Sequence, residues 1–198
     1  MNRLQKNLAR LATDLENLGA RWALVGALAL VARAYVRNTV DVDVVVSVRG
    51  DAEAEALVSK LFDLGYQQHQ VLERKSKTQL RGVRLLAPQN GGAEGVVDLL
   101  FAVCGTEPEI VDSAELMEVL PGVSIPVASR GHLLAMKILA WRDQDLMDAR
   151  FLLRDAEGSE ILDAEEALRL ISQRGFAEAG ALEARLQYLK ESAPRAGD

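Results

Sequence analysis

The chain has 198 residues, of which 49% are hydrophobic and 26% are charged, and its formal net charge at pH 7 is -6. A chain of this length can bury a core in one larger domain, or in a domain joined to a smaller helical one. No apolar run approaches the roughly 20 residues that span a bilayer, and one cysteine excludes an internal disulfide, so we expect a cytoplasmic protein without a membrane span.

The spacing of apolar residues predicts alternating helices and strands up to about residue 128 and helices beyond it. Helices are expected at residues 4–18, 28–35, 51–64, 143–155, 164–173 and 176–191, and a further helix is capped by Ser129. Strands are expected at 22–25, 40–46, 66–72, 78–86 and 96–103, with 115–127 extended around a Pro121-Gly122 turn. The predicted fold class is α/β (α+β): a domain of residues 1–128 with a mixed sheet flanked by helices, and a C-terminal helical region of residues 129–198.

In chain order, the first segment that points to chemistry is a strand followed by a helix. Residues 22–25 read as a short buried strand, which runs through Gly26 into the alanine- and leucine-rich stretch 27–32. Unpaired backbone N–H groups and a positive helix dipole at such a turn suit a phosphate group. A lone glycine between a strand and a helix is more often a plain turn.

The strand of residues 40–46 carries two carboxylates. Because successive side chains of a strand point to opposite faces, Asp41 and Asp43 share one face while Val40, Val42 and Val44 share the other. Like charges at this spacing repel, so the pair is unfavourable unless a positive group lies beside it, and a divalent cation is the obvious candidate. The alternative is an amphipathic strand that shows both carboxylates to water.

This order of strand, glycine turn, helix and Asp-x-Asp strand resembles the DNA polymerase beta-like nucleotidyltransferase superfamily. Members carry a third carboxylate on a later strand, and Asp98 matches it within the apolar run 95–103. A buried carboxylate there needs a partner or a metal, because leaving it unpaired costs roughly several kcal/mol. The chain departs from the pattern at Ala27, where the family has a second Gly or Ser, so that only backbone donors remain in the turn.

A second block lies in residues 131–148. Lys137 is spaced by four residues from both Leu133 and Trp141, so a helix places it on an apolar face. The block is similar to the Lys helix and Arg-x-x-Asp-x-x-Asp connection of the abortive-infection (AbiEii-like) branch, which includes the nucleotidyltransferase toxins of bacterial type IV toxin–antitoxin pairs. The alternative for Lys137 is an amine that reaches water past an apolar face.

The resemblance implies an enzyme that moves a nucleoside monophosphate from a nucleoside triphosphate (NTP) to a hydroxyl group. It implies two Mg²⁺ ions held by Asp41, Asp43 and Asp98, which are hard oxygen ligands. Asp98 would hold the ion next to the attacking hydroxyl and accept its proton. The remaining residues expected to bind the nucleotide are Gly26, Ala27, Arg37, Thr39, Lys137 and Asp148, the last of which orients Lys137 or the attacking group.

The acceptor is left open by the residues. The toxin branch favours tRNA or another RNA as the acceptor and a cognate antitoxin as a partner. A basic cluster at Arg74, Lys75, Lys77, Arg81 and Arg84 predicts a rim that contacts RNA, or else a charged edge that resists aggregation. Residues 143–198 hold all of the net negative charge, which suits a small cationic acceptor such as an aminoglycoside. A nucleotide-binding regulatory protein without catalysis is the remaining alternative.

Overall fold

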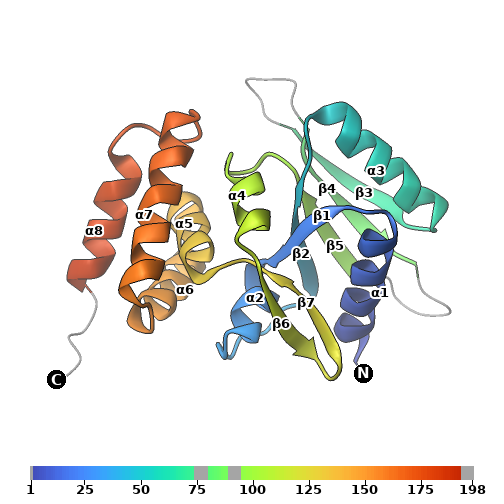
Figure 1. Ribbon diagram of the computed structural model, residues 1–198, viewed down its shortest axis with the longest axis horizontal. Coiled ribbons are helices and arrows are strands. Elements are labelled where there is room, and N and C mark those ends of the chain that lie inside the picture. The colour runs from blue at the N-terminus through green and yellow to red at the C-terminus, as the bar shows by residue number, and fades with distance from the viewer. Residues whose placement is uncertain (1, 74–79, 89–94, 193–198) are drawn as a thin grey trace. The chain divides into compact units, whose positions relative to one another are not determined.

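The computed structural model describes residues 2–73, 80–88 and 95–192, with eight helices and seven strands among them (Figure 1). The chain divides into two compact units. The first comprises Met1–Val103 and Glu107–Ala128, and the second comprises Cys104–Thr106 and Ser129–Asp198. No helix within the described ranges has the length and apolar character needed to cross a membrane.

The first unit is built on one sheet of seven strands, in the order β3-β4-β5-β2-β1-β7-β6. The β2–β5 and β1–β7 pairs are parallel, and the other neighbouring strands are antiparallel. This arrangement confirms the predicted mixed sheet. The strands are β1 (Arg21–Val25), β2 (Asp41–Ser47), β3 (Gln67–Glu73), β4 (Leu80–Ala87), β5 (Gly95–Leu100), β6 (Glu115–Leu120) and β7 (Val123–Val127).

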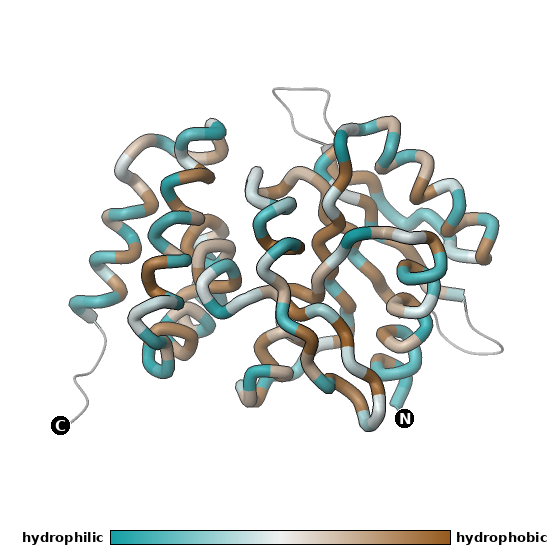
Figure 2. Tube along the Cα trace, in the orientation of Figure 1, coloured by the Kyte–Doolittle hydropathy of each residue, from teal (hydrophilic) through white to brown (hydrophobic). Residues whose placement is uncertain are grey.

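Four helices belong to the first unit: α1 (Arg3–Asn17), α2 (Gly26–Ala32), α3 (Asp51–Asp63) and α4 (Glu107–Asp112). Helix α1 is amphipathic and buries Leu8, Leu11 and Leu15 at the spacing of one helix face. The edge strand β3 is mostly hydrophilic, whereas the central strands β1, β2 and β5 are rich in hydrophobic residues, drawn in brown in Figure 2. Burial of these side chains is the main force that holds the sheet and its helices together.

The second unit is helical, as predicted, and contains α5 (Arg130–Ala140), α6 (Asp143–Arg154), α7 (Gly158–Gln173) and α8 (Ala181–Ser192). Ser129 caps α5 by accepting a hydrogen bond from the backbone N–H of His132. The C-terminal carbonyls of Ile138 and Leu139 in α5 both accept hydrogen bonds from Arg185 of α8, at 3.0 and 3.2 Å. These contacts satisfy carbonyl groups that a helix end leaves without a partner.

Most predicted elements are present, and four boundaries were wrong. Helix α2 ends at Ala32 rather than at residue 35, because Ala34 takes a positive φ of 65° and its N–H bonds back to Val31. Strand β5 stops at Leu100 because the next two N–H groups both donate to the carbonyl of Arg81. The other two differences are α7, which begins six residues earlier than predicted, and α8, which begins five later, after Gly180. Helix α4 was not predicted.

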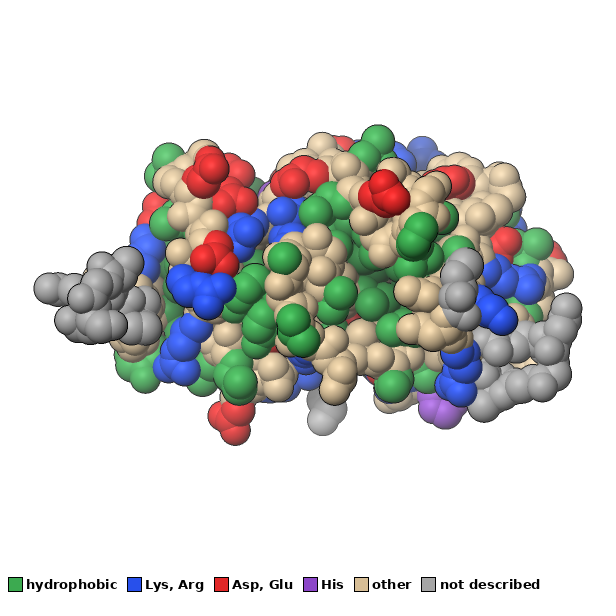
Figure 3. Space-filling view, turned by 90° about the horizontal axis from the view of Figure 1, so that it is seen from below, with side chains coloured by type: hydrophobic (Ala, Val, Ile, Leu, Met, Phe, Trp, Pro, Cys, Tyr) green, Lys and Arg blue, Asp and Glu red, His purple; other side chains and the backbone are tan. Residues whose placement is uncertain are grey.

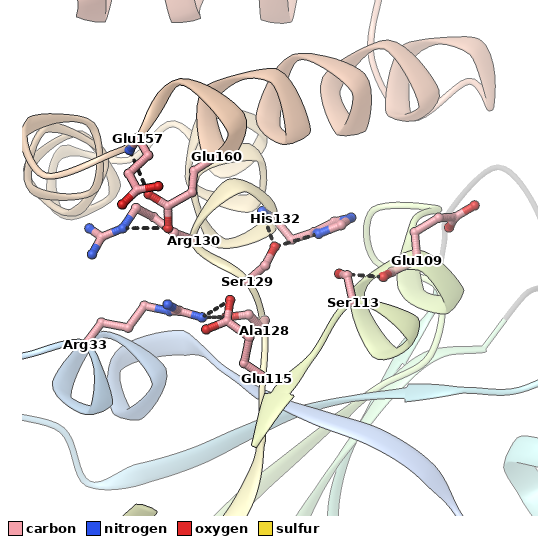
Figure 4. A network of polar contacts seen from close by, with 10 residues as sticks. All are labelled: Arg33, Glu109, Ser113, Glu115, Ala128, Ser129, Arg130, His132, Glu157 and Glu160. Atoms are coloured by element: carbon pink, nitrogen blue, oxygen red, sulfur yellow. Dashed lines mark hydrogen bonds and ion pairs between the residues drawn. The ribbon is translucent and has the colours of Figure 1, made fainter. Parts of the chain in front are cut away.

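Two largely buried arginine side chains also connect segments that are distant in the chain. In the first unit Arg33 donates a 2.7 Å hydrogen bond to the carbonyl of Ala128 and forms an ion pair with Glu115 at 3.2 Å (Figure 4). In the second unit Arg130 pairs with Glu160 at 3.2 Å. Each of these side chains is held within its own unit by a contact with a residue distant in sequence.

A buried hydroxyl ties the start of β3 to α1. Tyr66 is 2% exposed and donates a 2.8 Å hydrogen bond to the carboxylate of Asp14. Burial, and then the hydrogen bond to Asp14, raise the pKa of Tyr66 well above its usual value, so that the hydroxyl keeps its proton.

We expect Tyr66→Phe to lower the free energy of unfolding by about 1.5 kcal/mol, because it removes a hydrogen bond to a charged group without changing the packing of the ring. Urea denaturation of the two proteins measures this difference. Tyr188→Phe is the matched control, because its side chain is 53% exposed and should change stability by less than about 0.5 kcal/mol. Equal effects of the two substitutions would contradict the role of the Tyr66 hydroxyl.

Candidate active site

The two aspartates of β2 share one face of the sheet, as their alternation predicts. Val42 and Val44 are fully buried on the opposite face, whereas the side chain of Asp41 is 33% exposed. The hydroxyl of Thr39 lies 3.3 Å from both the backbone N–H and the carbonyl of Asp41. Thr39 therefore fixes the point at which this strand begins.

The register of three adjacent strands aligns the charged residues in one row. Asp43 of β2 lies opposite Asp98 of β5, and Asp98 lies opposite Arg84 of β4. Directly paired residues of neighbouring strands point to the same face of the sheet, and the backbones of the two strands lie about 4.8 Å apart. The sheet thus brings together the three carboxylates that the sequence singled out, and it adds an arginine to them.

Arg84 binds Asp98 through both arms of its guanidinium group. Its Nε and Nη2 donate hydrogen bonds of 2.8 and 2.6 Å to the two oxygens of the carboxylate, and Nη2 lies 3.9 Å from Asp41. The side chain of Asp98 is 9% exposed, and that of Arg84 is 36% exposed. The hydrogen bond to Asp98 raises the pKa of Arg84 above its usual value, against the effect of burial, and the charges of the three aspartates add to this rise.

Gly26 meets the row at the end of β1. It has a positive φ of 66°, and a Cβ atom at this position would lie 2.8 Å from Cβ of Asp43 and closer still to its carboxylate. Only glycine combines this backbone conformation with room for the neighbouring carboxylate. The turn therefore requires glycine because Asp43 lies against it, a contact that no local sequence pattern predicts.

The other nucleotide-binding residues expected in the first unit lie close to this row in the chain. Ala27 is buried in the first turn of α2, and Arg37 lies half-buried in the segment between α2 and β2. Their roles, and that of Thr39, toward a nucleotide stay predictions.

The second unit holds the lysine that the sequence singled out. Lys137 of α5 forms ion pairs with Asp145 at 3.0 Å and with Asp148 at 2.9 Å, both on α6. The side chain of Asp148 is fully buried, and its Oδ1 also accepts a hydrogen bond from Gln144. Lys137, whose side chain is 13% exposed, is therefore the partner of two carboxylates, whereas the sequence left open an amine that reaches water. The action of Lys137 and Asp148 on a nucleotide stays a prediction.

The expected basic rim is corrected in part. Arg84 faces the carboxylate row, and Arg81 donates a 3.0 Å hydrogen bond to the carbonyl of Val103. The remaining basic residues of the cluster, Arg74, Lys75 and Lys77, lie outside the described residues. Arg84 does not belong to the predicted rim, because the pairing of β4 with β5 places Arg84 opposite Asp98.

The carboxylate row offers the hard oxygen ligands that Mg²⁺ prefers. Within residues 2–73, 80–88 and 95–192, however, no three His, Cys, Asp or Glu side chains form a ready-made metal site. Both oxygens of Asp98 accept hydrogen bonds from Arg84, whose guanidinium supplies the positive charge there. The residues therefore have the chemistry and the register that a divalent cation needs, but in this structure a guanidinium group, and not a set of metal ligands, engages Asp98.

The fold is shared with solved nucleotidyltransferase-like structures. An antigenic nucleotidyltransferase-like protein from Paracoccidioides brasiliensis superposes with a TM-score of 0.51 at 18% identity, over 95% of this chain and 87% of that chain. A nucleotidyltransferase candidate from Thermotoga maritima also has a TM-score of 0.51, at 16% identity, over 79% of this chain and 97% of that chain. These likenesses define a nucleotidyltransferase fold.

The sequence identifies the family more narrowly. Residues 9–195 match the nucleotidyl transferase AbiEii toxins of type IV toxin–antitoxin systems, and the chain belongs to this family. The match confirms the resemblance seen in the motifs and makes the protein a nucleotidyltransferase. A search of curated protein sequences finds no match to the chain.

Arg84 belongs to the site, whereas the sequence predicts it for the basic rim. The loop composition of residues 89–92 separates two apolar runs and indicates a hairpin there. A hairpin centred on the middle of that loop pairs residue 84 with residue 97, one residue short of the true partner. The observed pairing of β4 with β5 places Arg84 opposite Asp98, a shift of one residue that the loop composition does not predict.

We expect Gly26→Ala to destabilise the protein more than Gly19→Ala. Both glycines have a φ of +66°, but no atom lies within 4 Å of a Cβ at Gly19. Gly19→Ala should cost about 1 to 2 kcal/mol from backbone strain alone, and Gly26→Ala about 1 to 3 kcal/mol more from overlap with Asp43. Chemical denaturation of both variants measures the difference, and equal losses would show that Asp43 moves aside freely.

We expect Lys137→Met to cost about 3 kcal/mol or more, because it leaves the buried charge of Asp148 without its cation while keeping most of the side-chain volume. The free energy of unfolding from urea titration checks this expectation. Lys190→Met is the control, since the Lys190 ion pair with Glu165 is largely solvated and should be worth less than about 1 kcal/mol. A loss at Lys137 no larger than at Lys190 would argue for a solvated lysine.

Proposed function

We propose that the protein transfers a nucleoside monophosphate from an NTP to a hydroxyl group of an RNA acceptor, with tRNA as the first candidate. The observation that carries the proposal is the alignment of Asp43 with Asp98 across the β2–β5 pair, with Asp41 on the same face. Such a row is unfavourable for folding alone, because like charges on adjacent strands repel. Membership of the AbiEii family supports NTP as the substrate and an antitoxin as a partner.

The proposed cofactor is Mg²⁺, with two ions held by Asp41, Asp43 and Asp98. When bound, divalent cations at such a site promote loss of the proton from a hydroxyl and neutralise charge on the triphosphate. Asp41 and Asp43, which lie on the same strand, would provide oxygen ligands to both ions. Asp98 is the most buried of the three carboxylates and is proposed to accept the proton of the attacking hydroxyl.

The transfer forms one bond and breaks one. The hydroxyl oxygen bonds to the α-phosphorus, the bond from that phosphorus to the bridging oxygen breaks, and pyrophosphate leaves. The backbone N–H groups of Gly26 and Ala27 are proposed to bind the outer phosphates, and Arg37 and Thr39 to flank them. Lys137, oriented by Asp148, is proposed to neutralise charge on the triphosphate.

The choice of RNA as the acceptor rests on the toxin family. Figure 3 shows basic side chains in separate small groups on the face that it presents, with acidic side chains among them. On that face the described basic side chains do not form the continuous charged band that nonspecific RNA binding would use. We place the reaction in the cytoplasm, where NTP and tRNA occur together. A small cationic acceptor is the second candidate, because residues 143–198 are strongly acidic.

The test is incubation of the protein with Mg²⁺, each of the four labelled NTPs and total bacterial tRNA. We expect label on tRNA, and a loss of at least about 100-fold in rate for Asp41→Asn, which removes one of the charges that the reaction needs. Asp63→Asn, at an exposed position of α3, is the matched control and should keep full activity.

Other outcomes would redirect the proposal. Label on protein in place of tRNA would exclude RNA as the acceptor. Label that appears only with an added aminoglycoside would select the small cationic acceptor. Transfer that Asp41→Asn leaves unchanged would remove β2 from the mechanism.

A further inference from the structure

Arg84 is the cation that balances the carboxylate row in the first unit. Its two hydrogen bonds to Asp98 and its 3.9 Å ion pair with Asp41 place one guanidinium group beside two of the three aspartates. The charge of Asp43 also acts on it. Without this cation, Asp98 would lose both hydrogen bonds that it accepts from a cation, and its repulsion with the neighbouring carboxylates would be less compensated.

A divalent cation and this guanidinium group compete for the same ligands. Both are attracted by Asp98 and Asp41, and the two positive charges would repel each other at the few ångströms that separate neighbouring side chains of the row. The bidentate contact also engages both oxygens of Asp98. Full coordination by the three carboxylates therefore requires Arg84 to release Asp98.

The burial of the two partners decides which of them moves. The side chain of Asp98 is 9% exposed. Its strand, β5, lies in the interior of the sheet between β4 and β2. The side chain of Arg84 is 36% exposed, and its long, flexible stem allows the charged end to reach water. Release of Arg84 to solvent is therefore the easier movement, because it exposes a charge without exposing the core.

We propose that Arg84 is a positioning residue that holds Asp98 in the cation-free protein and is displaced from it when a divalent cation binds the carboxylate row. The inference rests on the proposed function, because it assumes that Asp41, Asp43 and Asp98 are cation ligands. It adds a means of regulating that site. Arg84 lowers the affinity of the carboxylate row for the cation and holds Asp98 in position when no cation is bound.

The experiment measures Mn²⁺ binding by isothermal titration calorimetry and melting temperatures in EDTA and in Mn²⁺. We expect Arg84→Gln to bind Mn²⁺ at least about tenfold more tightly than the unaltered protein, because the competing charge is gone. The same variant should melt at a lower temperature in EDTA and gain more from Mn²⁺, since the cation then replaces the missing guanidinium. Arg81→Gln is the control, because Arg81 contacts a carbonyl group and leaves the row unchanged.

Arg84→Lys keeps a positive charge but loses the bidentate contact, so its affinity for Mn²⁺ should lie between those of the unaltered protein and Arg84→Gln. This variant also provides the measurement if Arg84→Gln does not fold. Damage to the fold would weaken cation binding, so a tighter binding separates displacement from a merely structural role.

Equal or weaker Mn²⁺ binding by both Arg84 variants would overturn the inference. If the unaltered protein binds Mn²⁺ and Asp41→Asn/Asp43→Asn does not, that result would leave the proposed function standing. If Asp41→Asn/Asp43→Asn binds Mn²⁺ as well as the unaltered protein does, the carboxylate row is not the cation site, and both proposals fail together.

Discussion

The repulsion among three carboxylates is the constraint around which the first unit is arranged. Asp41 and Asp43 share a face of β2, and the parallel pairing with β5 puts Asp98 directly beside Asp43. Three features next to this row offset the repulsion among the carboxylates or hold their strands in place. Arg84 supplies charge from β4, Gly26 leaves room at the end of β1, and the valines of β2 anchor the strand in the core. Removing any one of these features would leave the repulsion less compensated or the strand less firmly held.

The second unit contains a comparable cluster, in which a lysine faces two carboxylates. Lys137 lies between Asp145 and Asp148, and the burial of these groups makes each contact stronger than a pair at the surface. In both units one cation faces more than one carboxylate, and in the second unit Arg142 adds a further ion pair to Asp145 at 3.2 Å. A cluster of this kind holds its residues in place by ion pairs. The same residues can therefore serve the fold and the chemistry.

The sequence could predict the parts of this arrangement that follow from local pattern. Alternation along residues 40–46 predicts that Asp41 and Asp43 share a face, and the glycine turn and family motifs point to Asp98 and Lys137. The partner of Asp98 depends instead on the register between β4 and β5, which neither a local pattern nor the composition of the connecting loop fixes to a single residue. The early end of α2 at Ala32 follows from a positive φ at Ala34, and alanine carries no sequence signal for such a conformation.

The charge of the row also bears on the order in which ligands bind. The row holds three carboxylates beside the guanidinium of Arg84, and an NTP is itself a polyanion. Carboxylates repel a polyanion, so in the proposed reaction divalent cations would bind before the nucleotide or together with it. Displacement of Arg84 would then favour the same order, because a cation that binds Asp98 reverses the local charge and frees the guanidinium. In the proposed reaction, cation binding and nucleotide binding would thereby be coupled through one buried carboxylate, and the free energy of releasing its arginine would set the strength of that coupling.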